Sequence, residues 1–137
     1  MLAKFDAEAA KAELRALVSK QFADGMLPHI IYWIPGKLHR YDWGTPGTSA
    51  LTQPPMLAYA AWEVHKAAED SDLLRELYPH LLRYYEYLVA KRDPCHHHLI
   101  GIINPDESGE DNSPRFDDVL HVPSDISLAS HLARRLE

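Results

Sequence analysis

The sequence predicts an all-α protein built from helix hairpins, with long irregular loops gathered at one end of the helices. Two observations favour this class. Apolar residues recur at helical spacing in three stretches, and no stretch shows the period-two alternation of a strand. The connections between the stretches are long and rich in glycine, proline and aromatic residues. Hairpins of this kind are typical of the layers of an α/α toroid.

The first predicted helix covers about residues 5–22, which are rich in Ala, Glu, Lys and Leu. Its apolar stripe consists of Leu14, Leu17, Val18 and Phe22. Asp24-Gly25 then provides a stop. A second helix is expected to start at Pro54-Pro55, because proline suits a first helical turn. Its stripe of Leu57, Ala61, Val64 and Ala68 contains small residues that allow another helix to approach closely.

A third helix is expected from Asp70-Ser71-Asp72, which supplies a cap, to about Lys91. Its apolar stripe is Leu74, Leu77, Leu81, Tyr84 and Leu88. Pro79 lies inside this stretch and is expected to kink or divide the helix near Tyr78. Asp93-Pro94 ends it, and a last helix is expected from about Ser127 to Glu137.

The composition excludes several classes of function. The chain of 137 residues carries 20 acidic and 14 basic residues, a net charge of −6, and has no long basic cluster, so we expect no nucleic-acid partner. Its longest apolar run, Met56 to Trp62, is too short to cross a bilayer. The lone Cys95 excludes an internal disulfide and fits a reducing compartment. A cytoplasmic protein without a membrane partner is therefore expected.

Two regions carry residues suited to a binding site. The connection over residues 26–53 is long and irregular, and such loops in compact domains usually have a functional reason. Its aromatic residues suit the apolar face of a sugar ring, and the amide that follows suits neighbouring hydroxyls. Ordinary core packing of the aromatics and a helix cap for the amide remain alternatives. The candidates for substrate binding are Tyr32, Trp33, Tyr41, Trp43 and Gln53.

The second region runs from Glu107 to Asp118 and holds five carboxylates, an arginine and two backbone-bending residues, Gly109 and Pro114. This pattern is too polar for a core and fits carboxylates aimed at a substrate. An acidic loop that binds Ca²⁺ or is merely solvated is the alternative. Arg115, four residues after Asp111, is able to bind a carboxylate through paired hydrogen bonds, with an internal pair to Asp117 or Asp118 as the alternative.

Three segments, in order, resemble glycoside hydrolase family 63 and its trehalase-like relatives, over roughly residues 20–118. They are Gln21 to Trp33, Thr52-Gln53-Pro54-Pro55-Met56, and the Glu-Ser-Gly-x-Asp-Asn-Ser-Pro-Arg run that begins at Glu107. The resemblance implies a partial (α/α)6 barrel and an inverting mechanism with a downstream glutamate as general base. Asn104-Pro105-Asp106 stands where relatives often carry His-Pro-Trp, which leaves the leaving-group specificity open.

The resemblance implies that Asp111 is the general acid, whose protonation would need partial burial or a nearby carboxylate. Glu107 is able to orient Asp111, bind sugar hydroxyls or cap the turn, and Arg115 to hold a sugar hydroxyl or a substrate carboxylate. Small α-glycosides of the glucosylglycerate, mannosylglycerate or trehalose type are the implied substrates.

The run His96-His97-His98 suggests a metal site, but adjacent imidazoles do not easily surround one ion. His29 and His121 would have to complete such a site, and nothing in the sequence places them. A loop is therefore the favoured interpretation, and we expect neither a metal nor a cofactor.

We therefore expect residues 1–137 to form one helical segment of a longer hydrolase barrel. This segment is expected to carry the general acid without the general base and to be inactive by itself. A non-catalytic helical carbohydrate-binding or structural segment is the alternative. Helix faces meant for neighbouring hairpins would then be exposed, which favours homo-oligomerisation.

Overall fold

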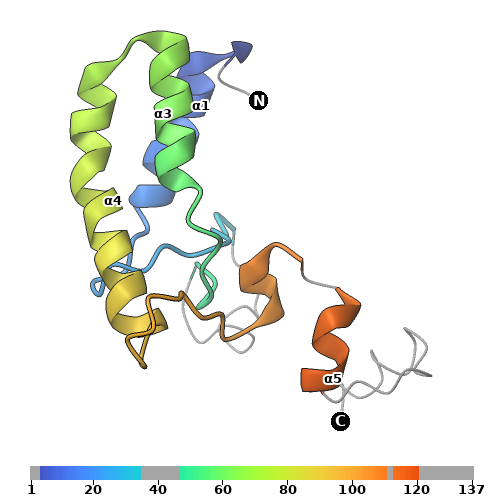
Figure 1. Cartoon of the computed structure of the whole chain (residues 1–137). Helices are drawn as coiled ribbons and strands as arrows, with labels where there is room; N and C mark the ends of the chain where they lie inside the picture. Colours follow the sequence, from blue (N-terminus) through green and yellow to red (C-terminus); the bar gives the residue numbers. More distant parts are fainter. Residues whose placement is uncertain (1–3, 35–46, 111–112, 121–137) are drawn as a thin grey trace.

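The computed structural model describes residues 4–34, 47–110 and 113–120 (Figure 1). Its three main helices are α1 (Ala7–Val18), α3 (Leu57–Ala68) and α4 (Ser71–Arg92). Two 3₁₀ helices, η2 (Pro105–Ser108) and η3 (Pro114–Phe116), and the short α5 (Asp117–Leu120) follow. Extended pairing in these described ranges amounts to one antiparallel bridge, between Ile31 and Thr48. The predicted all-α class is confirmed, while the helix predicted from Ser127 lies outside the described residues.

α4 starts with the predicted cap and α1 has a cap of the same kind, whereas α3 begins at Leu57, after the predicted start at Pro54-Pro55, without a side-chain cap. Asp6 accepts a hydrogen bond from the N–H of Ala9 at 2.9 Å at the start of α1. Asp70 accepts one from the N–H of Leu73 at 2.9 Å at the start of α4. Each side chain satisfies a backbone donor that the first helical turn leaves without a partner.

α1 ends at Val18, four residues before the predicted end at Phe22. Tertiary contacts of Gln21 explain the difference. Its side-chain amide donates to the carbonyls of Gly25 and of His80 on α4, both at 2.9 Å. Its side-chain oxygen accepts a hydrogen bond from Arg83 at 2.8 Å. These contacts hold residue 21 against α4 in a turn, so helical periodicity does not determine the end of the helix.

The core lies between α1, α3 and α4, which pack side by side in Figure 1. Three of the four residues of the predicted α3 stripe, Leu57, Ala61 and Val64, are buried, and the fourth, Ala68, is half-buried at the helix end. α4 buries Leu73 and Leu77 completely, so its core face is centred slightly differently from the predicted stripe. The other buried apolar residues are Ala10, Leu14, Val18, Met26, Leu27, Tyr84, Tyr87 and Leu88.

α4 runs unbroken through Pro79, so the predicted division of this helix is wrong. Pro79 has no N–H to donate to the carbonyl of Arg75. Both residues are exposed, and solvent is able to satisfy a carbonyl on that face. Proline is therefore tolerated inside a helix whose opposite face is anchored by core packing.

Ion pairs join α1 to α4. The Lys11 ammonium lies 2.8 Å from Asp70, and this contact, followed by the amide of Leu73, lowers the pKa of the Asp70 carboxyl. The Arg15 guanidinium binds both oxygens of Glu76 at 2.8–3.0 Å, in a half-exposed setting.

In Figure 1, α1 and α4 end, and α3 begins, at the lower end of the helix layer. The long connections gather at this end. Gly25, with φ of +98°, passes close to α4, and a Cβ at this position would lie 2.3 Å from the carbonyl oxygen of Arg83. Residues 29–32 and 47–51 then run antiparallel, joined by hydrogen bonds from His29 to Leu51 and from Tyr32 to Gly47. These two arms carry the candidate site residues toward the helix ends.

One face of α4 remains apolar and exposed. It consists of Tyr78, Leu82, Tyr85 and Val89, each at least 40% exposed and spaced by three or four residues. None of the helices in the described ranges is both long enough and apolar enough to span a bilayer.

Candidate sugar site

A cavity of about 520 Å³ opens where the two arms meet α1 and the start of α3. This volume lies within the usual range of small-ligand pockets. It is lined mainly by apolar side chains, with a few polar ones. Two residues predicted to bind substrate, Trp33 and Gln53, line it together although 20 positions separate them. The lining also includes Glu13, Leu17, Pro28, His29, Ile31, Thr52, Met56, Leu57 and Tyr84.

The aromatic candidates differ in their surroundings. Trp33 is 65% exposed and lies at the cavity, with the ammonium of Lys20 5.7 Å from its ring centroid. An indole in this position presents a face on which the CH groups of a sugar ring are able to stack. Tyr32 is half-buried. Tyr41 and Trp43 fall outside the described residues.

Gln53 sits on a turn whose backbone is held by neighbouring side chains. The hydroxyl of Tyr84 donates to the carbonyl of Gln53 at 2.7 Å and lies 2.9 Å from the hydroxyl of Thr52. Burial raises the pKa of the Tyr84 phenol, so this group keeps its proton for that hydrogen bond at neutral pH. Thr52, Gln53 and Pro54 also line a second, smaller pocket of about 210 Å³.

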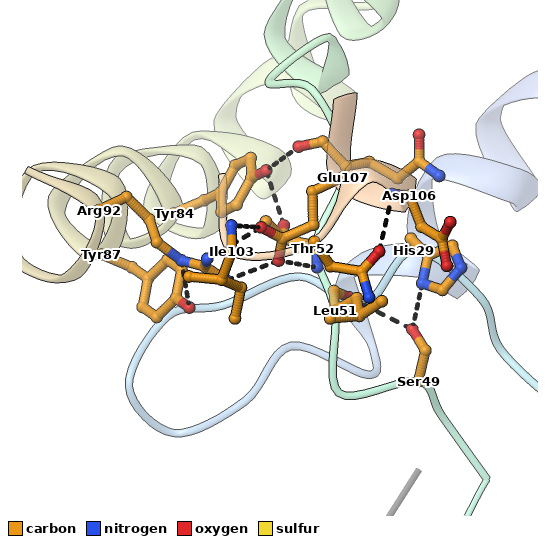
Figure 2. A network of polar contacts seen from close by, with 12 residues as sticks. His29, Ser49, Leu51, Thr52, Tyr84, Tyr87, Arg92, Ile103, Asp106 and Glu107 are labelled. Carbon is orange, nitrogen blue, oxygen red and sulfur yellow. Dashed lines mark hydrogen bonds and ion pairs between the residues drawn. The ribbon is translucent and has the colours of Figure 1, made fainter. Parts of the chain in front are cut away.

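Glu107, at η2, is 3% exposed and forms a buried ion pair with Arg92, which is 5% exposed. One carboxylate oxygen accepts hydrogen bonds from Arg92 at 2.6 Å and from the N–H of Thr52 at 3.1 Å. The other accepts them from Arg92 at 2.9 Å and from the N–H of Ile103 at 3.0 Å. Figure 2 shows Glu107 with Arg92, Thr52 and Ile103 around its carboxylate. The carboxylate of Glu107 is thus engaged by the protein itself and is not available to a sugar hydroxyl. That Glu107 orients Asp111 stays a prediction.

Arg92 is itself tightly held. Burial opposes its charge, but hydrogen bonds to Tyr87 and Glu107 outweigh that effect and raise the pKa of the guanidinium further. The Arg92 guanidinium therefore stays protonated throughout the physiological pH range.

The acidic segment is described on both sides of Asp111, which itself lies outside the described residues. Gly109 has φ of +74°, and a Cβ there would lie 3.7 Å from Pro54, so this turn packs on the Gln53 turn. Arg115 pairs with Glu110 at 2.9 Å. It also covers the ring of Phe116 at 4.7 Å and is more than half exposed. The internal partner recorded for Arg115 is thus Glu110, where the sequence suggested Asp117 or Asp118.

Sequence reasoning missed a role for His29 at this cavity. Its Nδ1 lies 2.6 Å from the hydroxyl of Ser49, which is fully buried and also accepts the N–H of Ile30 at 3.2 Å. His29 was considered only as a metal ligand. Its place within the aromatic segment that ends at Trp33 was the signal that pointed to the cavity.

The histidine run forms a loop, as the favoured interpretation expected. The carboxylate of Asp93 accepts the backbone N–H groups of His97 and His98, both at 2.8 Å. Within the ranges that the structure describes, no three potential metal ligands cluster in a way that would hold an ion.

The structure therefore combines a helical layer, whose long loops gather at one end, with an apolar cavity that has an indole, an imidazole and an amide in its lining. Comparisons with known proteins identify the family. The model for the mannosylglycerate hydrolase MGH1-like glycoside hydrolase domain matches residues 1–135. The chain belongs to this family, as the motifs indicated.

Curated relatives and solved structures agree with this assignment. The chain is 37% identical to mannosylglycerate hydrolase MGH1 of Selaginella moellendorffii, over 90% of its own length and 28% of the relative's. It is 30% identical to the glucosylglycerate hydrolase of Mycolicibacterium hassiacum, over 85% of the chain and 31% of that protein.

A crystal structure of a Thermus thermophilus family 63 mannosylglycerate hydrolase in complex with Tris and D-glycerate superposes with a TM-score of 0.79. Its sequence is 36% identical, over 90% of this chain and 32% of that one. A structure described as the same enzyme in complex with glucose gives a TM-score of 0.72. The chain therefore spans about a third of the length of the relatives it matches and corresponds to part of their barrel.

Proposed function

We propose that this chain forms the part of a glycoside hydrolase catalytic domain that binds the sugar of a small α-glycoside and supplies the general acid. The observation that carries the proposal is the cavity, which Trp33 from one family motif and Gln53 from a second motif both line. The third motif is tied to the same place, because Glu107 binds the N–H of Thr52.

In this proposal each residue has a separate task. Trp33, with Tyr32, Tyr41 and Trp43, stacks on the sugar, and Gln53 binds two neighbouring hydroxyls through its amide. Asp111 protonates the leaving glycosidic oxygen. The general base of an inverting reaction comes from the downstream barrel and activates water on the opposite face of the sugar.

The names of the relatives support a hexosyl glycerate as the substrate class. Mannosylglycerate and glucosylglycerate differ in the sugar and share a glycerate carboxylate. Arg115 is exposed and carries a planar guanidinium, which suits that carboxylate once its pairing with Glu110 is exchanged for the substrate. The protein is proposed to act in the cytoplasm, in carbohydrate metabolism, without nucleic acid as a partner.

We expect glucose to bind this chain at the cavity, and Trp33→Ala and Gln53→Ala each to weaken binding. Loss of one stacking surface or one hydrogen-bonding side chain corresponds to about 2- to 10-fold in Kd. Isothermal titration calorimetry measures both changes. Trp62→Ala is the matched control, since Trp62 is a half-exposed indole on α3 outside the cavity lining. Equal binding by all three variants would count against the proposal.

The exposed apolar face of α4 is proposed to be covered by a second copy of the chain. Sedimentation velocity at increasing concentration should then show self-association, which Leu82→Glu should reduce by placing a charge in the apolar stripe. Lys91→Glu, an exposed position at the end of the same helix, is the control and should leave association unchanged. A monomer at all concentrations would refute this part of the proposal.

A further inference from the structure

The contacts of Glu107 leave it no capacity for a sugar. A carboxylate has about four lone-pair directions, and all four are used by the two Arg92 donors and the N–H groups of Thr52 and Ile103. Because only 3% of its surface is exposed, Glu107 affects the cavity only through the backbone segments whose N–H groups it binds.

The backbone held in this way is the turn that carries Gln53. Glu107 binds the N–H of the residue before Gln53, and Tyr84 binds the carbonyl of Gln53 itself. The two contacts lie on either side of the Gln53 Cα, so together they fix the direction in which its side chain leaves the backbone. α4 supports both contacts, since Arg92 at its end pairs with Glu107 of η2 and Tyr84 lies two turns earlier.

We infer that Tyr84, Arg92 and Glu107 form a positioning unit, the Gln53 anchor, which pre-orders Gln53 for sugar binding without contact between Glu107 or Arg92 and the sugar. The inference rests on the proposed function of the cavity. A glutamine at the wall of an open cavity loses rotamer freedom when it binds hydroxyls, and a fixed backbone reduces that loss. The anchor therefore raises the affinity for the sugar by reducing the conformational freedom that Gln53 loses on binding.

Glu107→Gln tests the anchor with almost no change in shape. The new amide has one oxygen, which still accepts hydrogen bonds, and one NH₂ group, which does not. The NH₂ group would therefore lie against one Arg92 N–H and one backbone N–H, which are both donors. Either the N–H of Thr52 or that of Ile103 loses its acceptor. Tyr84→Phe is the second variant, because it keeps the ring packed, leaves the ion pair intact and removes the bond to the Gln53 carbonyl. Glu76→Gln is the matched control, since it alters a bidentate arginine pair remote from Gln53.

The experiment is an NMR titration of the full chain with glucose, together with ¹⁵N relaxation of the Gln53 side-chain amide. We expect Glu107→Gln and Tyr84→Phe to increase the mobility of this amide and to weaken glucose binding by as much as Gln53→Ala, about 2- to 10-fold. In the double variants Gln53→Ala/Glu107→Gln and Gln53→Ala/Tyr84→Phe, binding should be no weaker than in Gln53→Ala alone. Glu76→Gln should behave as the wild type.

Each other outcome has a definite meaning. Unchanged Gln53 mobility and unchanged affinity in a folded Glu107→Gln or Tyr84→Phe chain would overturn the anchor. Losses that add to that of Gln53→Ala would overturn it as well, because they would mean a general loss of structure. If Glu107→Gln does not fold, Tyr84→Phe decides. If the wild type binds no glucose, the proposed function fails, and Gln53 mobility alone decides whether the anchor exists.

Discussion

Replacing Asp111 by Asn is expected to lower kcat by about 10²- to 10⁴-fold, the usual contribution of a general acid or base. The measurement requires a complete barrel. A chimera in which this chain replaces the aligned third of the Thermus thermophilus mannosylglycerate hydrolase provides one, since the two superpose with a TM-score of 0.79. Asn has the same shape as Asp but carries no proton to donate to the leaving oxygen, so KM should change less than kcat.

Asp118→Asn is the matched control in the same chimera. Asp118 is an exposed carboxylate of the same segment, and its loss should leave turnover unchanged. Undiminished turnover after Asp111→Asn, or equal losses in the two variants, would remove Asp111 from the mechanism.

Replacing Glu107 by Ala is expected to destabilise the chain by about 3–5 kcal/mol, the cost of leaving one partner of a buried ion pair uncompensated. Arg92 would remain 5% exposed without its carboxylate, and two backbone N–H groups would lose their acceptor. Since whole domains are stable by only about 5–15 kcal/mol, this is a large fraction of the total. Urea denaturation followed by circular dichroism measures it.

Glu76→Ala provides the comparison for that measurement. It removes the carboxylate of a bidentate arginine pair of similar geometry, but one that is half-exposed and solvated. Only a small loss is expected there, because exposed ion pairs contribute little. Equal losses at positions 76 and 107 would show that burial does not set the importance of the Glu107 pair.

The helices were predictable because their determinants are local. Asp70 caps α4 and the stripe of Leu57, Ala61 and Val64 is buried, as periodicity and capping chemistry indicated. The early end of α1 was not predictable, because it depends on Gln21 bonding to residues of α4 about 60 positions away. Likewise, Pro79 was expected to kink or divide α4. That the helix continues through it depends on the exposure of Pro79 and on core packing of the opposite face, which the local sequence does not show.

The candidate site was predictable where residue type matched chemistry and the family motif. Trp33 and Gln53, two of the predicted substrate-binding residues, line one cavity, and their role in sugar binding stays a prediction. Arg92 and Tyr84 gave no signal in the sequence. In an amphipathic helix, a tyrosine is predicted to lie in the core and an arginine on the surface. Only the tertiary fold brings Arg92 to Glu107 and Tyr84 to Gln53. The sequence also gave no sign that the Glu107 carboxylate accepts four hydrogen bonds from three residues, Arg92, Thr52 and Ile103.

We propose that the three motif segments meet in one sugar-binding cavity, with Asp111 as its general acid. Chemical-shift mapping of the isotope-labelled chain during titration with glucose tests it most directly. The account predicts that the indole of Trp33, the side-chain amide of Gln53 and the backbone amide of Asp111 shift together, with one common Kd. Shifts confined to other surfaces, or shifts at Trp33 and Gln53 that leave Asp111 unaffected, would contradict it.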